Sequence, residues 1–298
     1  MKKALLILLF TFSWHLICAG EPKAKKYNLS ICAIFKNEAM YFREWIEYHR
    51  MIGVDHFYLY NNGSTDLFEQ ALKPYIKAGI ITLIHWPDHL KYYFLEESEK
   101  DSLWALSTQV PAYENAVKNR AINETKWLVF LDVDEYLVFP KEDLKLLIKK
   151  YDEYPAVSLV SDHFDCSNFA HVLPRRKLLI ETVELAALPE RHPQKEVTKT
   201  IFKPDECLGF TWPPYECIFK DERSAIKLKK NEARINHYVN RYKGRLNMEK
   251  RKEVLRVDHR LLSENEANEL LREGYEIEDQ ERAIQHYVPK LLKRLGLH

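Results

Sequence analysis

Three acidic residues interrupt an apolar run near the middle of the chain. Asp132, Asp134 and Glu135 follow the apolar residues 127–131 and precede a second apolar stretch. Carboxylates are rarely buried unless something pairs with them. If the strand continues through the acids, Asp132 and Asp134 point to the same face and their oxygens converge, and a cation relieves the resulting repulsion. The pattern therefore predicts a metal site. The alternatives are a solvated strand end or an acid pair bonded to Arg or Lys.

Strand-like and helix-like segments alternate ahead of these acids. Strands separated by helices imply a parallel sheet with helices on both faces, and such sheets bind ligands beyond the carboxyl ends of their strands. Asp66 is expected to cap the second helix, Pro74 to kink or break it, and Pro111 to interrupt the third. Strands are expected at 29–35, 55–60, 80–86 and 127–131, and helices at 38–53, 67–79 and 103–122.

Three polar turns are expected to meet at one rim of this sheet. Residues 36–38, 61–66 and 132–135 each follow a predicted strand. Because the carboxyl ends of parallel strands lie at the same edge, these side chains should lie close together. A chance pair of acids would not have such neighbours, so the arrangement favours a ligand site.

The second half of the chain is less regular. Residues 157–165 predict one more strand, and residues 199–219 alternate like a hairpin. A charged helical tail, 263–298, begins with a capping box and is expected to be solvated, with a basic membrane-binding or partner-binding tail as the alternative. The simplest division is one catalytic domain at 28–250 and a helical extension at 251–298.

The N-terminus predicts export. A basic start is followed by the apolar residues 4–19 and by the small residues Ala19 and Gly20, which suit a cleavage site. Residues 1–19 are therefore expected to be a signal peptide, or an uncleaved signal anchor that associates the protein with a membrane. The expected location is secreted or periplasmic, or membrane-anchored through residues 4–19.

Composition narrows the classes of partner. The 45 basic and 44 acidic residues leave a formal charge of +1, which argues against a nucleic acid partner. Cys32 lies within an apolar strand and is expected to be a free, buried thiol. Cys207 and Cys217 flank a proline pair and are the candidate disulfide, since export permits oxidation. The cysteine and histidine spacings do not match a structural zinc site.

Several motifs together resemble a known family. IFKNEAMYFREWIEYHRMIGVDHFYLYNNGSTD, QVPAYENAVKNRAINETKWLVFLDVDEYL and INHY are similar to segments of the bacterial members of glycosyltransferase family 92 and of their relatives in family 2. The likeness spans about residues 30–250. It implies an α/β GT-A (Rossmann-like) fold with a mixed, mainly parallel sheet flanked by helices and followed by a helical C-terminal tail.

The resemblance also implies an activity. Such enzymes transfer a hexose from a nucleotide sugar, here expected to be UDP-linked, to a glycan or other hydroxyl acceptor, and inversion at the anomeric carbon is expected. Asp132 and Asp134 would hold Mn²⁺ or Mg²⁺ against the diphosphate, with Asp134 the direct ligand and His237 a third ligand. A packed histidine is the alternative for His237. Glu135 would orient the strand end or bind a sugar, or form a structural ion pair.

The resemblance suggests a set of donor-binding positions. Turn formation alone would also explain the Asn and Asp residues in the set. Packing would explain the helical pair Gln109 and Tyr113, and a solvated side chain is the alternative for Lys199. The donor-binding candidates are Asn37, Asn62, Asp66, Gln109, Asp132 and Lys199.

The acceptor side is left open. An inverting transfer needs a base for the acceptor hydroxyl, and Asp162, His163 and Glu216 are the candidates. Relatives carry Gly-Ser-Gly near 161–164 and a His near 211–215, and this chain has neither there. Those departures motivate a second hypothesis, a catalytically inactive, secreted carbohydrate-binding protein on the same fold. A nucleotidyltransferase is disfavoured, because IFKNEAM supplies no Gly-rich phosphate loop.

Overall fold

The computed structural model describes residues 24–87, 108–140, 143–165, 178–182, 197–210, 217–239 and 284–297. The expected signal segment at 1–19 and the start of the expected C-terminal helix lie outside these ranges. Within them, none of the helices has the length and apolar character that a membrane crossing requires.

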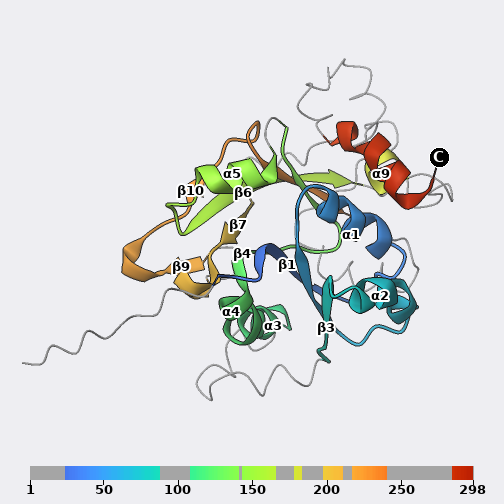
Figure 1. The fold of residues 1–298 in the computed structure, drawn as a ribbon, viewed down its shortest axis with the longest axis horizontal. Helices are drawn as coiled ribbons and strands as arrows, with labels where there is room; N and C mark the ends of the chain where they lie inside the picture. Colours follow the sequence, from blue (N-terminus) through green and yellow to red (C-terminus); the bar gives the residue numbers. More distant parts are fainter. Residues whose placement is uncertain are drawn as a thin grey trace, which may run out of the picture.

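A mixed, mainly parallel sheet organises the fold (Figure 1). Its strands are β1 (Tyr27–Phe35), β2 (His56–Asn61), β3 (Ile81–His85), β4 (Thr125–Phe130), β5 (Glu135–Val138), β6 (Ala156–Asp165), β7 (Thr198–Phe202), β10 (Ile226–Lys227) and β11 (Arg234–Val239). The strand order is β3-β2-β1-β4-β7-β6-β11-β5, with β10 paired to β6. β7 and β5 pair antiparallel to their neighbours, and the other pairings are parallel.

Helices cover both faces of the sheet. On one face, α1, α2, α5 and α9 complete a large apolar core that includes Trp127 and Leu159. On the other, α3 and the hairpin of β8 and β9 cover a smaller core that includes Phe130 and Phe202. The expected fold class is therefore confirmed. The bounds of these elements are α1 (Phe42–Met51), α2 (Phe68–Lys77), α3 (Gln109–Ala116), α4 (Ile122–Glu124), α5 (Leu144–Lys150), α6 (Leu179–Thr182), α9 (Val288–Leu295), β8 (Cys207–Phe210) and β9 (Cys217–Phe219).

Several predicted details of the helices are wrong. Asp66 does not cap α2, because its carboxylate accepts a hydrogen bond from the backbone N–H of Ala39 at 2.8 Å. Pro74 lies inside α2 without ending it, so the predicted break is not formed, and a kink there stays a prediction. Pro111 does not interrupt α3, since it lies in the first turn, where its missing N–H would have had no helical acceptor. A π-helical turn, Val117–Ala121, instead joins α3 to α4.

The expected hairpin at 199–219 divides between two sheets. β7 joins the main sheet between β4 and β6, whereas β8 and β9 pair with each other. Within the described residues, Cys32, Cys207 and Cys217 are free thiols, so the predicted Cys207–Cys217 disulfide is not formed. The two thiols are hydrogen-bonded, and this bond lowers the pKa of Cys207. Cys32 is buried and unbridged, as predicted.

Helix α1 covers the outer edge of β5. The Trp45 indole donates to the carbonyl of Glu135 at 2.9 Å, and the Tyr48 hydroxyl donates to the carbonyl of Leu137 at 2.7 Å. The N–H of Leu137 donates to His49 Nε2 at 3.3 Å. Burial lowers the pKa of His49 to about 3, so the imidazole is neutral and can accept. These bonds satisfy backbone groups that an edge strand leaves free and fix the position of Glu135.

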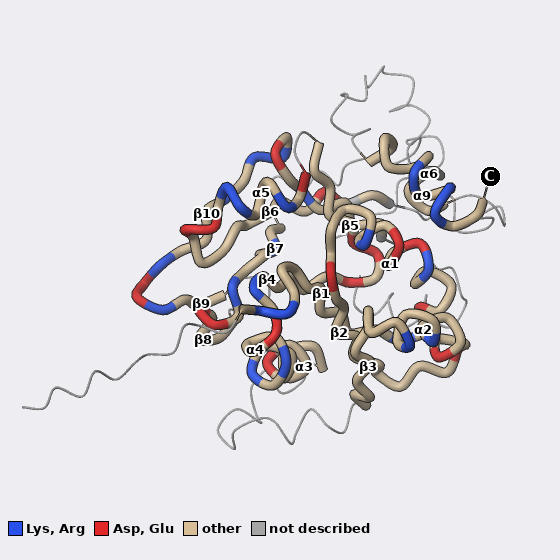
Figure 2. The backbone as a smooth tube through the Cα atoms, in the orientation of Figure 1, with Lys and Arg blue, Asp and Glu red and all other residues tan. Residues whose placement is uncertain are grey.

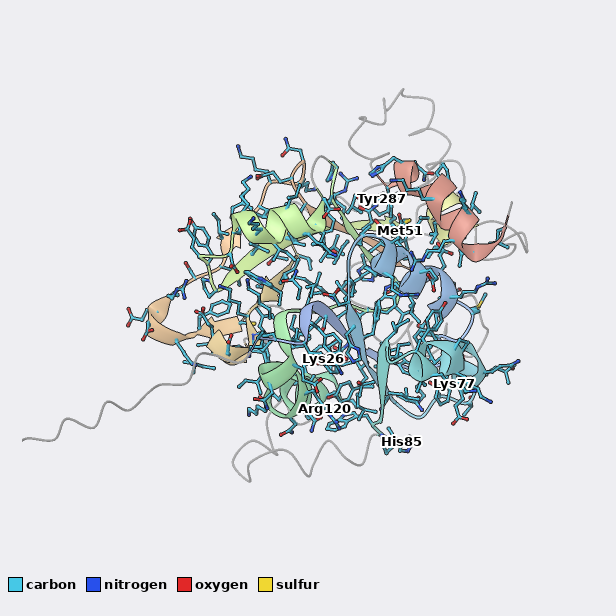
Figure 3. All side chains as sticks on the ribbon, in the orientation of Figure 1. Lys26, Met51, Lys77, His85, Arg120 and Tyr287 are labelled. Carbon is cyan, nitrogen blue, oxygen red and sulfur yellow. The ribbon has the colours of Figure 1, made fainter. Side chains whose placement is uncertain are left out.

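The C-terminal helix α9 packs against α1. Leu291 is fully buried, and the Arg43 guanidinium donates to the carbonyl of Leu295 at 2.7 Å. Just ahead of α9, Tyr287 contacts Tyr48 with ring centroids 5.5 Å apart. Tyr287 and Met51 are labelled where the two helices meet in Figure 3. Figure 2 shows basic positions in blue along α9. The apolar side of the helix is nevertheless buried, so the expectation of a solvated terminal helix is wrong for this part of the chain.

Replacing Leu291 by Ala should destabilise the whole domain. The change leaves a cavity where α9 meets α1 and should lower the free energy of unfolding by about 2–5 kcal/mol. Urea denaturation followed by circular dichroism measures this. Lys293→Ala, on the exposed side of α9, is the control and should stay within about 0.5 kcal/mol of wild type. A separate, earlier transition in the wild type would contradict the prediction, because α9 would then unfold independently.

Glu47 should make the contact between α1 and α9 sensitive to acid. Burial alone would raise its pKa, but hydrogen bonding and charge from Arg294 outweigh burial and hold the pKa below 4.5. The native state then binds this proton less tightly than the unfolded state. The stability that Glu47 contributes is therefore present above about pH 4.5 and is lost as the pH falls through the native pKa.

Glu47→Gln should remove that part of the pH dependence. Urea midpoints measured at a series of pH values above and below the ordinary carboxyl pKa should fall less steeply in acid for the variant than for wild type. Glu69→Gln, at an exposed position of α2, is the matched control and should keep the wild-type profile. Identical acid profiles for Glu47→Gln and wild type would show that Arg294 does not stabilise the charged form.

Candidate active site

The three acids lie at a turn between two strands. β4 ends at Phe130 and β5 begins at Glu135, so Asp132 and Asp134 do not belong to a continuous strand. The N–H of Glu135 donates to the carbonyl of Asp132 at 3.0 Å, and the N–H of Asp132 donates to the Glu135 carboxylate at 2.8 Å. The prediction that strand alternation aligns Asp132 with Asp134 is therefore wrong. The chain leaves β4 here and crosses to pair with β11.

Lys199 binds two of the acids from β7. Its ammonium contacts the Glu135 carboxylate directly and lies 3.3 Å from Asp132 Oδ2. Lys199 is only 4% exposed and the Glu135 side chain 2%, whereas Asp132 is 31% exposed. The alternative of a solvated lysine is wrong. A buried ion pair of this kind resists loss of either member, because the other would remain as an uncompensated buried charge.

The charge of Glu135 is set by opposing effects. Burial raises its pKa, the Lys199 ammonium opposes the rise, and Asp132 adds to it. The net direction is upward, because desolvation of a fully enclosed carboxylate is the largest contribution. Among the alternatives weighed for Glu135, the structure shows the ion pair.

His237 brings Asp134 into the same cluster. Its Nε2 lies 3.5 Å from Asp134 Oδ1, and its Nδ1 lies 3.7 Å from Glu135 Oε1. The antiparallel register of β5 and β11 places His237 opposite Glu135, and the N–H of Tyr238 donates to the carbonyl of Asp134 at 2.8 Å. Burial alone would lower the pKa of His237, but Asp134 and Glu135 outweigh it and raise the pKa above 6.5.

The side chains of this cluster suit a hard divalent cation only in part. Carboxylate oxygens and an imidazole nitrogen are ordinary ligands for Mn²⁺, and the structure brings Asp134 and His237 together. Asp132 instead faces Lys199. Across the described part of the chain, no three His, Cys, Asp or Glu side chains are grouped so as to hold a metal ion. Figure 2 marks acidic positions in red beside the β5 label.

Two of the predicted donor-binding loops bind each other. The N–H of Thr65 donates to the Asn37 side-chain carbonyl at 2.8 Å, and the N–H of Asn37 donates to the Ser64 hydroxyl at 3.0 Å. Asn37 adopts a left-handed backbone with φ 59°, which costs energy for a residue other than Gly. The Asn62 amide donates to the carbonyl of Trp86 at 3.0 Å. The polar turns after β1 and β2 therefore meet, as predicted.

These contacts do not decide a role in donor binding. The amide oxygen of Asn37 and the amide nitrogen of Asn62 bond to backbone, and Asp66 bonds to Ala39, so these groups join neighbouring loops. The third polar turn follows β4, which pairs parallel to β1, so it starts from the same edge of the sheet. Donor binding by these residues stays a prediction.

The helical pair of donor candidates starts α3. Gln109 is its first residue and is half-buried. Tyr113 is buried and stacks on Phe130, with ring centroids 4.1 Å apart and planes within 5°. The packing explanation therefore holds for Tyr113, and a donor contact by Gln109 remains a prediction.

The three candidate bases are placed differently. Asp162 pairs with Lys230, and its Oδ2 lies 3.8 Å from Arg234 Nε, so two basic groups compensate its charge. His163 lies in β6 opposite His237 of β11 in the parallel register, and its side chain is outside the described part. Glu216 is likewise outside, as is the whole segment 211–216. The identity of the base stays a prediction.

Arg234 is a buried charge that the motifs did not single out. It is 2% exposed, and its guanidinium donates to the Asn236 side chain at 3.0 Å. Asn236 donates in turn to the Tyr238 hydroxyl at 3.2 Å. The available signal was an arginine directly ahead of INHY, in a segment that reads as a strand.

Similarity to curated protein sequences supports the resemblance seen in the motifs. A family 92 glycosyltransferase of Oryza sativa subsp. japonica is 26% identical over 189 residues, which are 61% of this chain and 28% of the rice protein. One from Arabidopsis thaliana is 26% identical over 237 residues, 73% of this chain and 37% of that protein. The galactan beta-1,4-galactosyltransferase of Arabidopsis thaliana is 32% identical over 143 residues, 45% of this chain and 26% of its own. The chain thus spans about a third of the length of these relatives.

Solved structures overlay only loosely. Glucosyl-3-phosphoglycerate synthase from Mycobacterium tuberculosis, in complex with Mn²⁺, UDP and glucosyl-3-phosphoglycerate, gives a TM-score of 0.35 at 14% identity and covers 76% of this chain and 77% of its own. TarS 1–349 of S. aureus in complex with UDP gives 0.31 at 17% identity, covering 50% of this chain and 38% of its own. At such scores the likeness carries no inference about this chain.

The family itself follows from a match along most of the chain. The model for glycosyltransferase family 92 matches residues 25–273, which include β1 to β11 and every acid of the site. The curated relatives from rice and Arabidopsis carry the same family name. This chain therefore belongs to glycosyltransferase family 92.

Proposed function

We propose that this chain is a metal-dependent glycosyltransferase. It transfers a hexose from a nucleotide sugar, expected to be UDP-linked, to a hydroxyl of a glycan or other acceptor, with inversion at the anomeric carbon. Family membership over residues 25–273 supports the reaction class. The observation that carries the proposal for this chain is the pairing of Asp134 with His237, 3.5 Å apart, at the turn after a parallel strand.

Asp134 and His237 are the residues that would hold Mn²⁺ or Mg²⁺. When bound, such an ion neutralises negative charge on the departing nucleotide diphosphate. Glu135 contacts the other ring nitrogen of His237 at 3.7 Å and orients the imidazole. Lys199 holds Glu135 in place from β7 and keeps a positive charge beside Asp132.

The register favours one base candidate over another. The charge of Asp162 is compensated by Lys230 and Arg234, whereas the neighbouring position 163 lies opposite His237 in the register of β6 and β11. We therefore favour His163 over Asp162 as the group that takes the acceptor proton. Glu216 remains the third candidate.

A second candidate function rests on Lys199. Its ammonium compensates Asp132 and Glu135 without any metal ion, which is the arrangement expected if the acids only stabilise the fold. The protein would then be a carbohydrate-binding member of the family without transferase activity. A lectin of this kind should not be stabilised by UDP with Mn²⁺.

A thermal-shift panel separates the two functions. A ligand that binds only the folded state raises the unfolding midpoint by mass action. UDP, UDP-glucose, UDP-galactose and a GDP-sugar, each with and without Mn²⁺, are the probes, and hydrolysis of the effective donor is measured alongside. We expect a shift that requires a nucleotide and is larger with Mn²⁺. Equal midpoints in every condition would contradict the transferase proposal.

Replacing Asp134 by Asn should abolish turnover without unfolding the protein. The amide keeps the shape but removes the charge, so donor hydrolysis and transfer should fall at least about 100-fold. The free energy of unfolding should change by less than about 1 kcal/mol. Asp205→Asn, at an acid whose side chain is 52% exposed, is the control and should retain full activity. Unchanged turnover in Asp134→Asn would defeat the assignment.

Replacing Lys199 by Met should destabilise the fold strongly. Glu135 would remain buried without its counter-ion, at a cost of about 3–5 kcal/mol in denaturant titrations. Adding Glu135→Gln should restore part of the loss, because the buried charge is removed as well. If Lys199→Met unfolds at the wild-type midpoint, the ion pair does not hold the site together.

A further inference from the structure

Ser161 carries a buried hydroxyl that has no partner among the described residues. The residue lies in β6 and is 9% exposed, and its side-chain oxygen has no hydrogen bond to any described residue. Buried polar groups are nearly always bonded, and an unsatisfied one costs about 1–3 kcal/mol. A serine kept in this state at the edge of a candidate active site calls for a ligand that completes its bonding.

The strand registers place this hydroxyl on the face of the acid cluster. Leu159 lies opposite Lys199 in the antiparallel ladder of β6 and β7, and Ser161, two residues further along β6, points to the same face. On the other side of β6, Ser161 lies opposite Ile235, and two residues on, His163 lies opposite His237.

The same face therefore includes the buried ion pair. His237 lies opposite Glu135 in the ladder of β11 and β5, so both share the face of Ser161. Lys199 reaches Glu135 from β7 across that face. Along β6, Ser161 thus lies between Leu159, which is opposite Lys199, and His163, which is opposite His237.

The charges around Ser161 select the ligand. A hydroxyl donates one hydrogen bond and accepts two, which matches the hydroxyl of a sugar. Asp132, Asp134 and Glu135 make the surroundings acidic, and the ammonium of Lys199 already binds two of them. A phosphate oxygen with no metal ion beside it would be repelled there, whereas a neutral sugar hydroxyl would not.

We infer that the Ser161 hydroxyl binds a hydroxyl group of a sugar substrate and positions it beside the acid cluster. This inference rests on the proposed function and adds a residue that reads the carbohydrate. The sugar is either the hexose of the donor or the acceptor, and the two sources give different results in the experiment below. Ser161 is a binding residue here and takes no part in bond making.

The free protein and the complex should respond in opposite directions to Ser161→Ala. The substitution removes an unsatisfied polar atom, so the unliganded midpoint should stay the same or rise. Sugar binding should weaken about 3- to 10-fold, the effect of losing one uncharged hydrogen bond. A residue that merely supports the fold would show the reverse pattern.

Ser158→Ala supplies the matched control. Ser158 lies in the same strand with the same 9% exposure, but on the other face, opposite Thr200. Thermal midpoints of wild type and both variants are measured without ligand, with UDP, and with UDP-glucose or UDP-galactose, all with Mn²⁺. Subtracting the UDP shift from the UDP-sugar shift isolates the contribution of the sugar. The KM for the acceptor is measured with an oligosaccharide panel.

Each outcome decides between the sources or against the inference. A smaller sugar contribution in Ser161→Ala alone, with an unchanged UDP shift, supports contact with the donor hexose. An unchanged sugar contribution with a raised acceptor KM supports contact with the acceptor. A lowered unliganded midpoint, or sugar binding and KM equal to wild type, overturns the inference. If the wild type binds UDP-sugar but does not turn it over, the proposed transferase activity is contradicted. The sugar binding of Ser161→Ala compared with wild type still tests the inference about Ser161.

Discussion

A buried ammonium facing a buried carboxylate holds this site together. Lys199 and Glu135 are almost completely removed from water, and neither charge could be left alone there without a large penalty. The pair joins β7 to the start of β5 across the sheet. Because β5 follows directly on Asp132 and Asp134, the position of the acidic turn depends on that contact.

The rest of the site is arranged around this pair. Helix α1 satisfies the outer edge of β5 through Trp45, Tyr48 and His49, and α9 packs on α1 in turn. On the other edge of β5, β11 brings His237 to Asp134 and Glu135. The C-terminal helix therefore supports the face that carries the acids through α1, even though it lies far from the acids in sequence.

The same constraint explains why the three acids lie in different environments. Glu135 is committed to Lys199, and Asp132 turns toward the same ammonium, whereas Asp134 lies with an imidazole. Asp134 lies beside His237, whose pKa is raised, whereas Asp132 is partly exposed and lies beside Lys199. The two carboxylates are therefore in distinct electrostatic environments. The proposed donor chemistry therefore falls to Asp134. The hydroxyl of Ser161, which has no hydrogen bond to the described residues, adds a group suited to the neutral part of a sugar.

The sequence by itself determined strands β1 to β4 and β6, the parallel arrangement of β1 to β4, and the polar turns after β1, β2 and β4, because apolar runs and turn residues act over short distances. It also singled out the acids and His237. Only the tertiary structure decided that Asp132 and Glu135 share Lys199, which lies 67 residues from Asp132 along the chain. It also decided that Ser161 faces the acid cluster while Asp162 does not. Those outcomes depend on strand register between distant segments, and a shift of one residue would exchange the two faces.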